Sequence, residues 1–119
     1  MGENMSDLTL EALERRRDEL EEEVKKLREE VEKIRAVYEK AKRLEDEAYE
    51  AMRKARDQSE MSRLEVRYLR ISDKRKAIEA KLNEAESRLR GAIQELEEVK
   101  RKISYRKPRP ARWIEEKPG

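Results

Sequence analysis

The chain has 119 residues, of which half are Asp, Glu, Lys or Arg and only 35% are hydrophobic. This composition is too poor in apolar side chains for a compact globule, and it is typical either of disorder or of long helices with solvated polar faces. The absence of Cys and His removes disulfides and the commonest metal ligand and general base, so we expect no metal site and no cofactor.

The same sequence favours a particular compartment and source. No apolar run is long enough to cross a membrane, and no secretory signal opens the chain, so we expect a cytoplasmic protein that does not bind membranes. Glu, Lys and Arg are abundant, whereas only two Asn and two Gln are present, which is a thermophile-like composition that coiled coils also share.

The first predicted helix carries a heptad pattern. From Leu13 onward, apolar residues recur every three or four positions, which is the spacing of one helix of a coiled coil. The d positions of this frame are Leu13, Leu20, Leu27, Ile34, Ala41, Ala48 and Ala55, and the a positions are Arg17, Val24, Val31, Tyr38, Glu45 and Met52. We therefore expect a helix over residues 7–56 after an N-terminal extension of residues 1–6, with Ser6 or Asp7 as its N-cap.

A second heptad frame follows and is offset from the first by two residues. Its a positions are Met61, Tyr68, Arg75, Leu82, Leu89, Leu96 and Ile103, and its d positions are Leu64, Ile71, Ile78, Ala85, Ala92 and Val99. A continuous coiled coil usually absorbs insertions of three or four residues, so an offset of two predicts a turn near residues 56–62 and a second helix over 61–104. Asp57 and Ser59 are good N-caps for that helix, and Ser62 to Glu65 has the spacing of a capping box.

These two frames predict an all-α fold, an antiparallel coiled-coil helical hairpin over residues 7–104. In an antiparallel pair, the residue numbers of two facing positions add up to a constant. If that constant is 116, large residues repeatedly face small ones, as Val31 faces Ala85. In this register Glu45 and Arg75 lie in neighbouring layers, where they could pair. A sum of 123, with the turn at 60–63, is the alternative that the pattern leaves open.

The half of the hairpin next to the turn is more apolar than two helices require, which predicts a partner. Apolar residues off the a/d seam form a candidate oligomer interface: Val37, Leu44, Ala51, Val66 and Leu69. A wide apolar stripe suits a helix that contacts several neighbours, so we expect a larger helical bundle, with a homodimer favoured over a different helical partner. The alternative is that these side chains are scattered and partly exposed, which is common.

The basic tail, residues 105–119, carries the clearest functional signal. Between Lys100 and Arg112 there are seven basic residues and no acidic one, and Pro108 and Pro110 favour an extended chain. Cations neutralise phosphates and aromatic rings stack on bases, so this segment suits nucleic acid, RNA more than DNA. The candidate binding residues are Lys100, Arg101, Lys102, Tyr105, Arg106, Lys107, Arg109, Arg112 and Trp113.

Other interpretations of the charged segments remain open at this stage. The tail could be a solubilising extension, or Trp113 and Ile114 could anchor it in a groove of another protein. Residues 53–76 hold nine basic and four acidic groups and could contact RNA. No motif supports such a contact, so a solvated helix face is the favoured interpretation.

The sequence contains no catalytic constellation and no glycine-rich phosphate loop, so we do not expect an enzyme. We expect a non-catalytic structural or interaction protein associated with nucleic acid, such as a ribosome or chromatin accessory factor. The alternative function is a protein-directed adaptor or assembly factor that binds partners through the helical arms and a Trp-anchored tail.

Overall fold

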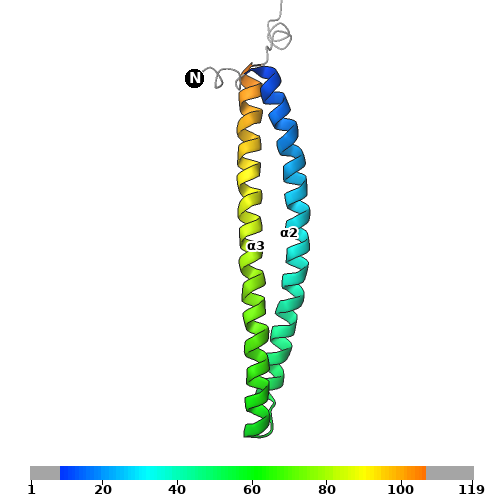
Figure 1. Cartoon of the computed structure of the whole chain (residues 1–119), viewed down its shortest axis with the longest axis vertical. Coiled ribbons are helices and arrows are strands. Elements are labelled where there is room, and N and C mark those ends of the chain that lie inside the picture. The colour runs from blue at the N-terminus through cyan, green and yellow to red at the C-terminus, as the bar shows by residue number, and fades with distance from the viewer. Residues whose placement is uncertain (1–8, 107–119) are drawn as a thin grey trace, which may run out of the picture. The chain divides into compact units, whose positions relative to one another are not determined.

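The structure, a computed structural model, describes residues 9–106. These residues form two α-helices, α2 (Leu10–Arg53) and α3 (Gln58–Arg106), joined by a connection of residues 54–57 (Figure 1). The two helices pack against each other as an antiparallel coiled-coil hairpin, which confirms the predicted fold class. Within residues 9–106, neither helix contains a stretch long and apolar enough to cross a membrane.

The chain divides into two compact units. The turn unit comprises residues 26–89, which include the connection. The end unit comprises residues 1–25 and 90–119, of which 9–25 and 90–106 belong to the described part of the chain.

Helix α2 begins at a threonine cap. The Thr9 hydroxyl accepts a hydrogen bond from the backbone N–H of Ala12 (3.1 Å), and the Thr9 carbonyl accepts one from the N–H of Leu13 (3.0 Å). The first bond satisfies a backbone donor that the first turn of a helix leaves without an intrahelical partner, and the second is the first regular hydrogen bond of the helix. The cap of α2 is therefore Thr9. The expected caps, Ser6 and Asp7, lie outside the described residues together with the rest of the predicted 1–6 extension.

Helix α3 begins at an aspartate cap, as one of the sequence expectations proposed. The Asp57 carboxylate accepts a hydrogen bond from the backbone N–H of Glu60 (2.8 Å), and the Glu60 carboxylate accepts one from the N–H of Arg56 (2.8 Å). This reciprocal pair is a variant of the capping box. The predicted box starting at Ser62 is wrong, because Ser62 lies inside the helix that Asp57 has already started.

The observed boundaries differ from the predicted ones by a few residues. The connection, residues 54–57, lies earlier than the expected 56–62, because Asp57 supplies the cap and Ser59 becomes part of the first turn. At the other end, α3 continues to Arg106, so Tyr105 and Arg106 are helical although the tail was predicted to begin at residue 105. The predicted tail beyond them lies outside the described residues.

The core of the turn unit forms along the predicted seam. Val31 of α2 packs with Leu82 and Ala85 of α3 in one buried cluster, and Tyr38 and Leu89 are among the half-buried side chains packed against it. The predicted register with a sum of 116 pairs Val31 with Ala85, whereas the alternative sum of 123 would pair it with Ala92. The cluster and the connection at 54–57 therefore decide in favour of the first register.

The end unit has its own seam of apolar side chains. Seven of them are buried: Leu13, Leu20, Val24, Ala92, Leu96, Val99 and Ile103. At its edge, Arg16 donates hydrogen bonds to Glu95 from Nε (3.2 Å) and Nη2 (2.8 Å). Both side chains of this pair are about half exposed, so water screens the attraction and the seam provides most of the packing energy.

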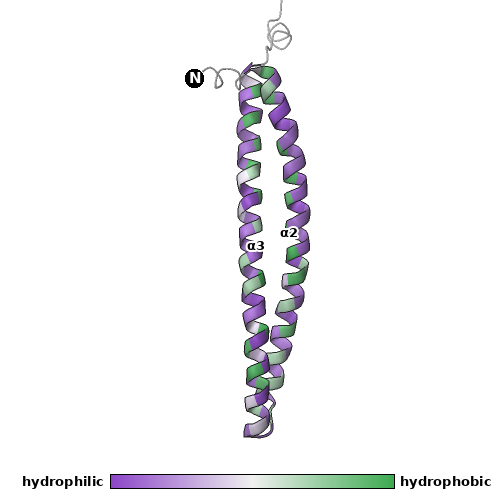
Figure 2. Cartoon of the chain, in the orientation of Figure 1, coloured by the Kyte–Doolittle hydropathy of each residue, from purple (hydrophilic) through white to green (hydrophobic). Residues whose placement is uncertain are grey.

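Burial follows the two heptad frames closely. Every buried side chain among residues 9–106 except Ser72 occupies a predicted a or d position. Figure 2 shows the corresponding pattern, with hydrophobic residues recurring at intervals between hydrophilic ones along α2 and α3. Since the apolar stripe of each helix faces its partner, the remaining charged residues lie on solvated faces.

Candidate interaction surfaces

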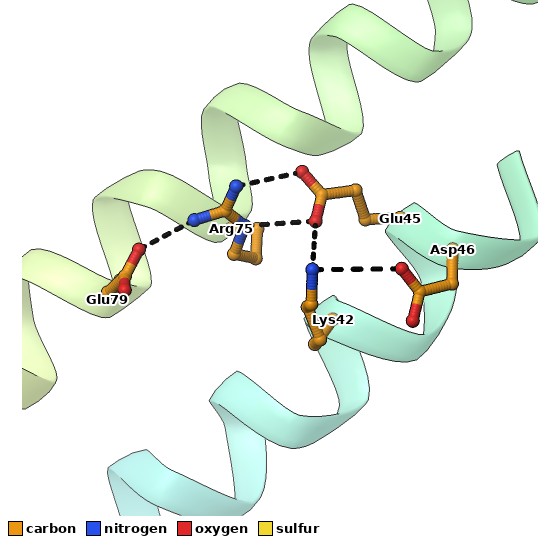
Figure 3. A network of polar contacts seen from close by, with 5 residues as sticks. All are labelled: Lys42, Glu45, Asp46, Arg75 and Glu79. Atoms are coloured by element: carbon orange, nitrogen blue, oxygen red, sulfur yellow. Dashed lines mark hydrogen bonds and ion pairs between the residues drawn. The ribbon is translucent and has the colours of Figure 1, made fainter. Parts of the chain in front are cut away.

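An ionic network with a buried pair at its centre crosses the turn unit (Figure 3). Arg75 of α3 donates hydrogen bonds from Nε and Nη2 to the two carboxylate oxygens of Glu45 on α2, at 3.1 and 3.0 Å. The Glu45 side chain is 5% exposed and that of Arg75 is 17% exposed. This pairing confirms the expectation that these two seam residues meet.

Further groups extend the network on either side. Lys42 Nζ lies 3.3 Å from Glu45 Oε1 and 3.7 Å from Asp46 Oδ1, and Arg75 Nη1 donates to Glu79 Oε1 at 2.6 Å. Arg75 therefore binds both oxygens of Glu45 through two nitrogens of its planar guanidinium while a third nitrogen binds Glu79. The single nitrogen of a lysine could not reproduce this forked contact.

The network changes the acidity of Glu45. Hydrogen bonds from Arg75 lower its pKa from 4.5 to about 2, against the opposing effect of burial, and hydrogen bonds from the Ser72 hydroxyl and from Lys42 lower it further. The hydrogen bond to Glu45 satisfies the hydroxyl of Ser72, a polar side chain that is buried off the seam. The Glu45 carboxylate is therefore ionised at neutral pH, and both of its oxygens accept hydrogen bonds that hold the two helices together.

An apolar groove of about 260 Å³ lies between α2 and α3 in the turn unit. Its lining residues are Val37, Lys40, Ala41, Leu44, Ile71, Lys74 and Ile78. Ala41, Ile71 and Ile78 are half-buried seam residues, whereas Val37 and Leu44 are 52% and 43% exposed. The groove therefore leaves apolar surface in contact with water.

The two lysines of the groove carry uncompensated charge. Within residues 9–106, neither Lys40 nor Lys74 makes an ion pair, and no acidic residue lines the groove. Lys42, two residues away from Lys40, is by contrast held between Glu45 and Asp46. The groove is thus apolar and positively charged at the same time.

The predicted oligomer interface is divided between different surfaces. Val37 and Leu44 line the groove, whereas Val66 and Leu69 are 49% and 53% exposed and do not line it. At about 100° per residue, Leu69 points about 160° away from Ile71 around α3, which explains the separation. Ala51 is half-buried and also lies outside the groove lining.

The residues next to the connection form a basic region. Of the nine cations in residues 53–76, Arg53 pairs with Glu50 (3.9 Å) and Arg75 belongs to the ionic network. The other seven make no ion pair within the described part of the chain: Lys54, Arg56, Arg63, Arg67, Arg70, Lys74 and Lys76. The four acidic residues of this segment leave an excess of positive charge, and two of them, Asp57 and Glu60, accept backbone hydrogen bonds of the helix cap.

The end of α3 presents the described part of the predicted nucleic-acid site. Lys100, Arg101, Lys102, Tyr105 and Arg106 are all exposed, and Tyr105 is 80% exposed. Ile103, which lies among these residues in the sequence, is buried in the seam of the end unit. Lys100 lies 4.0 Å from Glu21, at the limit of an ion pair. The remaining candidates, Lys107, Arg109, Arg112 and Trp113, lie outside the described residues.

Sequence reasoning missed part of the groove. Lys40, Lys74 and the outer edges of Ile71 and Ile78 were not assigned to an interaction surface. The signal was present, because Val37, Lys40 and Leu44 follow helical spacing on α2 and Ile71, Lys74 and Ile78 follow it on α3.

Comparison with known proteins adds no relative from which a function could be transferred. The chain matches no family model, and no curated protein or solved structure is detectably similar to it.

Proposed function

We propose that this chain is a non-catalytic, cytoplasmic interaction protein that associates with RNA through the basic end of α3 and the tail that follows it. The observation that carries this proposal is the combination of exposed cations with an exposed aromatic ring, Tyr105, at the end of one helix. Phosphate groups are bound by Lys and Arg, and unstacked bases bind to aromatic rings, so this combination suits single-stranded RNA.

The helix dipole alone does not account for this surface. Lys and Arg in the last turn of a helix are favourable because they lie near its negative end. That effect explains Arg106, but it does not favour a tyrosine that is 80% exposed. The helix dipole acts on charged groups only, whereas stacking on a base would remove the apolar ring of Tyr105 from water.

Fluorescence anisotropy of the full chain with a short labelled single-stranded RNA tests the proposal. We expect the affinity to fall steeply with salt, because each neutralised phosphate contributes about 0.7 to the log–log slope for single strands. Replacing Lys100, Arg101 and Lys102 together with Gln should reduce the magnitude of that slope by about 2. Tyr105→Ala should weaken binding by about 1–3 kcal/mol, and Tyr105→Phe should retain most of the affinity.

The basic region near the connection provides the matched control. Replacing Arg63, Arg67 and Arg70 together with Gln removes the same charge from exposed positions of the turn unit. An equal loss of affinity in this variant would place the RNA contact away from the end of α3. Binding that does not depend on salt, or that is unchanged in the Lys100, Arg101 and Lys102 variant, would contradict the proposal.

The apolar groove favours a second candidate function, a protein-directed adaptor or assembly factor. Val37 and Leu44 leave apolar surface exposed in a groove between two helices, and apolar grooves of this kind are where partner proteins bind. A homodimer is the form of this association that the sequence pattern favours. Sedimentation equilibrium tests it, since a dimer broken by Leu44→Glu would identify the groove as its interface.

A further inference from the structure

The apolar groove of the turn unit has properties that specify its partner further. We propose that this groove binds one acidic amphipathic helix of another protein, whose apolar stripe covers Val37 and Leu44 and whose carboxylates pair with Lys40 and Lys74. This inference rests on the protein-directed function proposed above and adds the chemistry of the partner.

The geometry of the groove suits a helix. On α2 the lining residues are Val37, Lys40, Ala41 and Leu44, and on α3 they are Ile71, Lys74 and Ile78. Both sets follow the spacing of three, four and seven residues that places side chains on one face of a helix. A third helix lying between two antiparallel helices packs against such ridges, as in helical bundles.

The length of the groove sets the size of the contact. Seven residues separate Val37 from Leu44, and seven separate Ile71 from Ile78. At 1.5 Å per residue, each ridge spans about 10 Å, or about two helical turns. A partner helix therefore needs an apolar stripe of about two turns, with residues at positions i, i+3 or i+4, and i+7.

The charge of the groove selects an acidic partner. Both charged residues of the lining are lysines, and neither makes an ion pair within the described residues. The other side of α2 differs, because Lys42 there is neutralised by Glu45 and Asp46. Carboxylates flanking the apolar stripe of a partner would complement Lys40 and Lys74, and such complementarity determines which partners can bind.

A second copy of this chain fits the groove less well. The commonest homodimers are two-fold symmetric, so each copy contributes the same surface to the interface. A groove-to-groove contact would bring Lys40 and Lys74 of one copy close to the same lysines of the other. Like charges facing each other in an interface are unfavourable. The partner we infer is therefore a different, acidic chain.

Two synthetic peptides serve as probes for the full-length chain. Both carry Leu at positions i, i+3 and i+7 of a helix; the remaining positions are mainly Glu in the acidic peptide and mainly Lys in the basic peptide. Fluorescence anisotropy measures binding of each labelled peptide. We expect the acidic peptide to bind, the basic peptide to bind about tenfold more weakly or not at all, and the affinity for the acidic peptide to fall as salt is added.

Three variants locate the contact. Leu44→Glu should weaken binding of the acidic peptide by about thirty-fold, the effect of losing a central interface residue. Leu69→Glu is the matched control, because Leu69 is similarly exposed but lies outside the groove, and it should leave binding unchanged. The double variant Lys40→Glu, Lys74→Glu keeps the apolar lining and should reverse the preference, so that the basic peptide binds better.

The outcomes separate this inference from the function on which it rests. If the basic peptide binds the wild-type chain as well as the acidic one and Leu44→Glu abolishes both, the groove is a protein-binding site but the acidic partner is wrong. A wild-type dimer that Leu44→Glu dissociates would make a second copy the occupant and overturn the inference. If neither peptide binds and the chain is monomeric, both the inference and the protein-directed function fail. Circular dichroism of each variant verifies that the helices remain folded.

Discussion

Arg75 on α3 binds both carboxylate oxygens of Glu45 on α2, although each residue occupies a seam position at which the frames otherwise place mainly apolar side chains. A buried ion pair of this kind contributes little to stability compared with apolar residues of similar size, because both groups lose hydration. Removing only one partner is unfavourable, because the other remains buried without compensation. The pair therefore links the two helices at a defined position in the turn unit but adds little to the free energy of unfolding.

The first prediction concerns this asymmetry. Glu45→Ala should lower the free energy of unfolding by about 1–3 kcal/mol, because it leaves the Arg75 guanidinium without its main acceptor. The double variant Glu45→Leu, Arg75→Leu should be at least as stable as the wild-type chain. Urea denaturation of the single and double variants measures the coupling. A double variant that is clearly less stable than the wild-type chain would show that the pair itself is stabilising.

The second prediction concerns pH. The pKa of Glu45 is about 2 in the folded chain against an ordinary value of 4.5, so the unfolded state binds the proton more readily. The stability that this carboxylate contributes is therefore complete above about pH 5 and is lost as the pH falls toward 2. The difference in unfolding free energy between wild type and Glu45→Gln should shrink over that window. A difference that stays constant with pH would contradict the depressed pKa.

The third prediction concerns the start of α3. Asp57→Ala should lower the free energy of unfolding by about 1 kcal/mol, because it removes the acceptor for the Glu60 N–H. Ser62→Ala is the control, since Ser62 lies within the helix and should be nearly neutral. Thermal unfolding followed by circular dichroism gives both values. If Ser62→Ala were the more damaging change, the helix would begin at the box that the sequence suggested.

The fourth prediction concerns Gly91. A Cβ atom added there would meet no atom within 4 Å apart from the adjoining backbone of its own helix, and the residue is exposed in the interior of α3. Gly91→Ala should therefore raise the free energy of unfolding by about 1 kcal/mol through helix propensity alone. Ala77→Gly, at the equivalent heptad position and also exposed, should lower it by a similar amount. A neutral or destabilising Gly91→Ala would indicate that this position contacts a partner.

The seam could be predicted from the sequence because periodicity reports directly which side chains face a neighbouring helix. Buried positions such as Leu20 and Ala85 follow from their place in the frames. Ser72 does not, because a polar residue off the seam leaves no trace in the apolar pattern, and its hydrogen bond to Glu45 is visible only in the structure. The exact caps could not be predicted either, since several Ser, Thr and Asp residues near each boundary are chemically suitable.

The interaction surfaces were only partly predictable. The exposed apolar character of Val37 and Leu44 is evident from their positions off the seam, but the sequence does not show that these two line a groove and that Val66 and Leu69 do not. A search for apolar residues off the seam does not distinguish the two sides of a helix. The charge of the groove depends in addition on which lysines already have acceptors, and only the arrangement of side chains distinguishes Lys40 from Lys42.

The connection between the helices has a consequence for how the hairpin tolerates change. No residue among 9–106 adopts a positive φ, so residues 54–57 make their reversal with conformations open to any ordinary amino acid. The alignment of the helices is therefore encoded in the seam, and the loop contributes mainly the Asp57 cap. A hairpin of this kind can accept a longer loop, since loop closure becomes only slightly less favourable with length. For the same reason, the hairpin could be cut within residues 54–57 into two separate chains, and these chains should reassemble through the side chains that face each other in the seam.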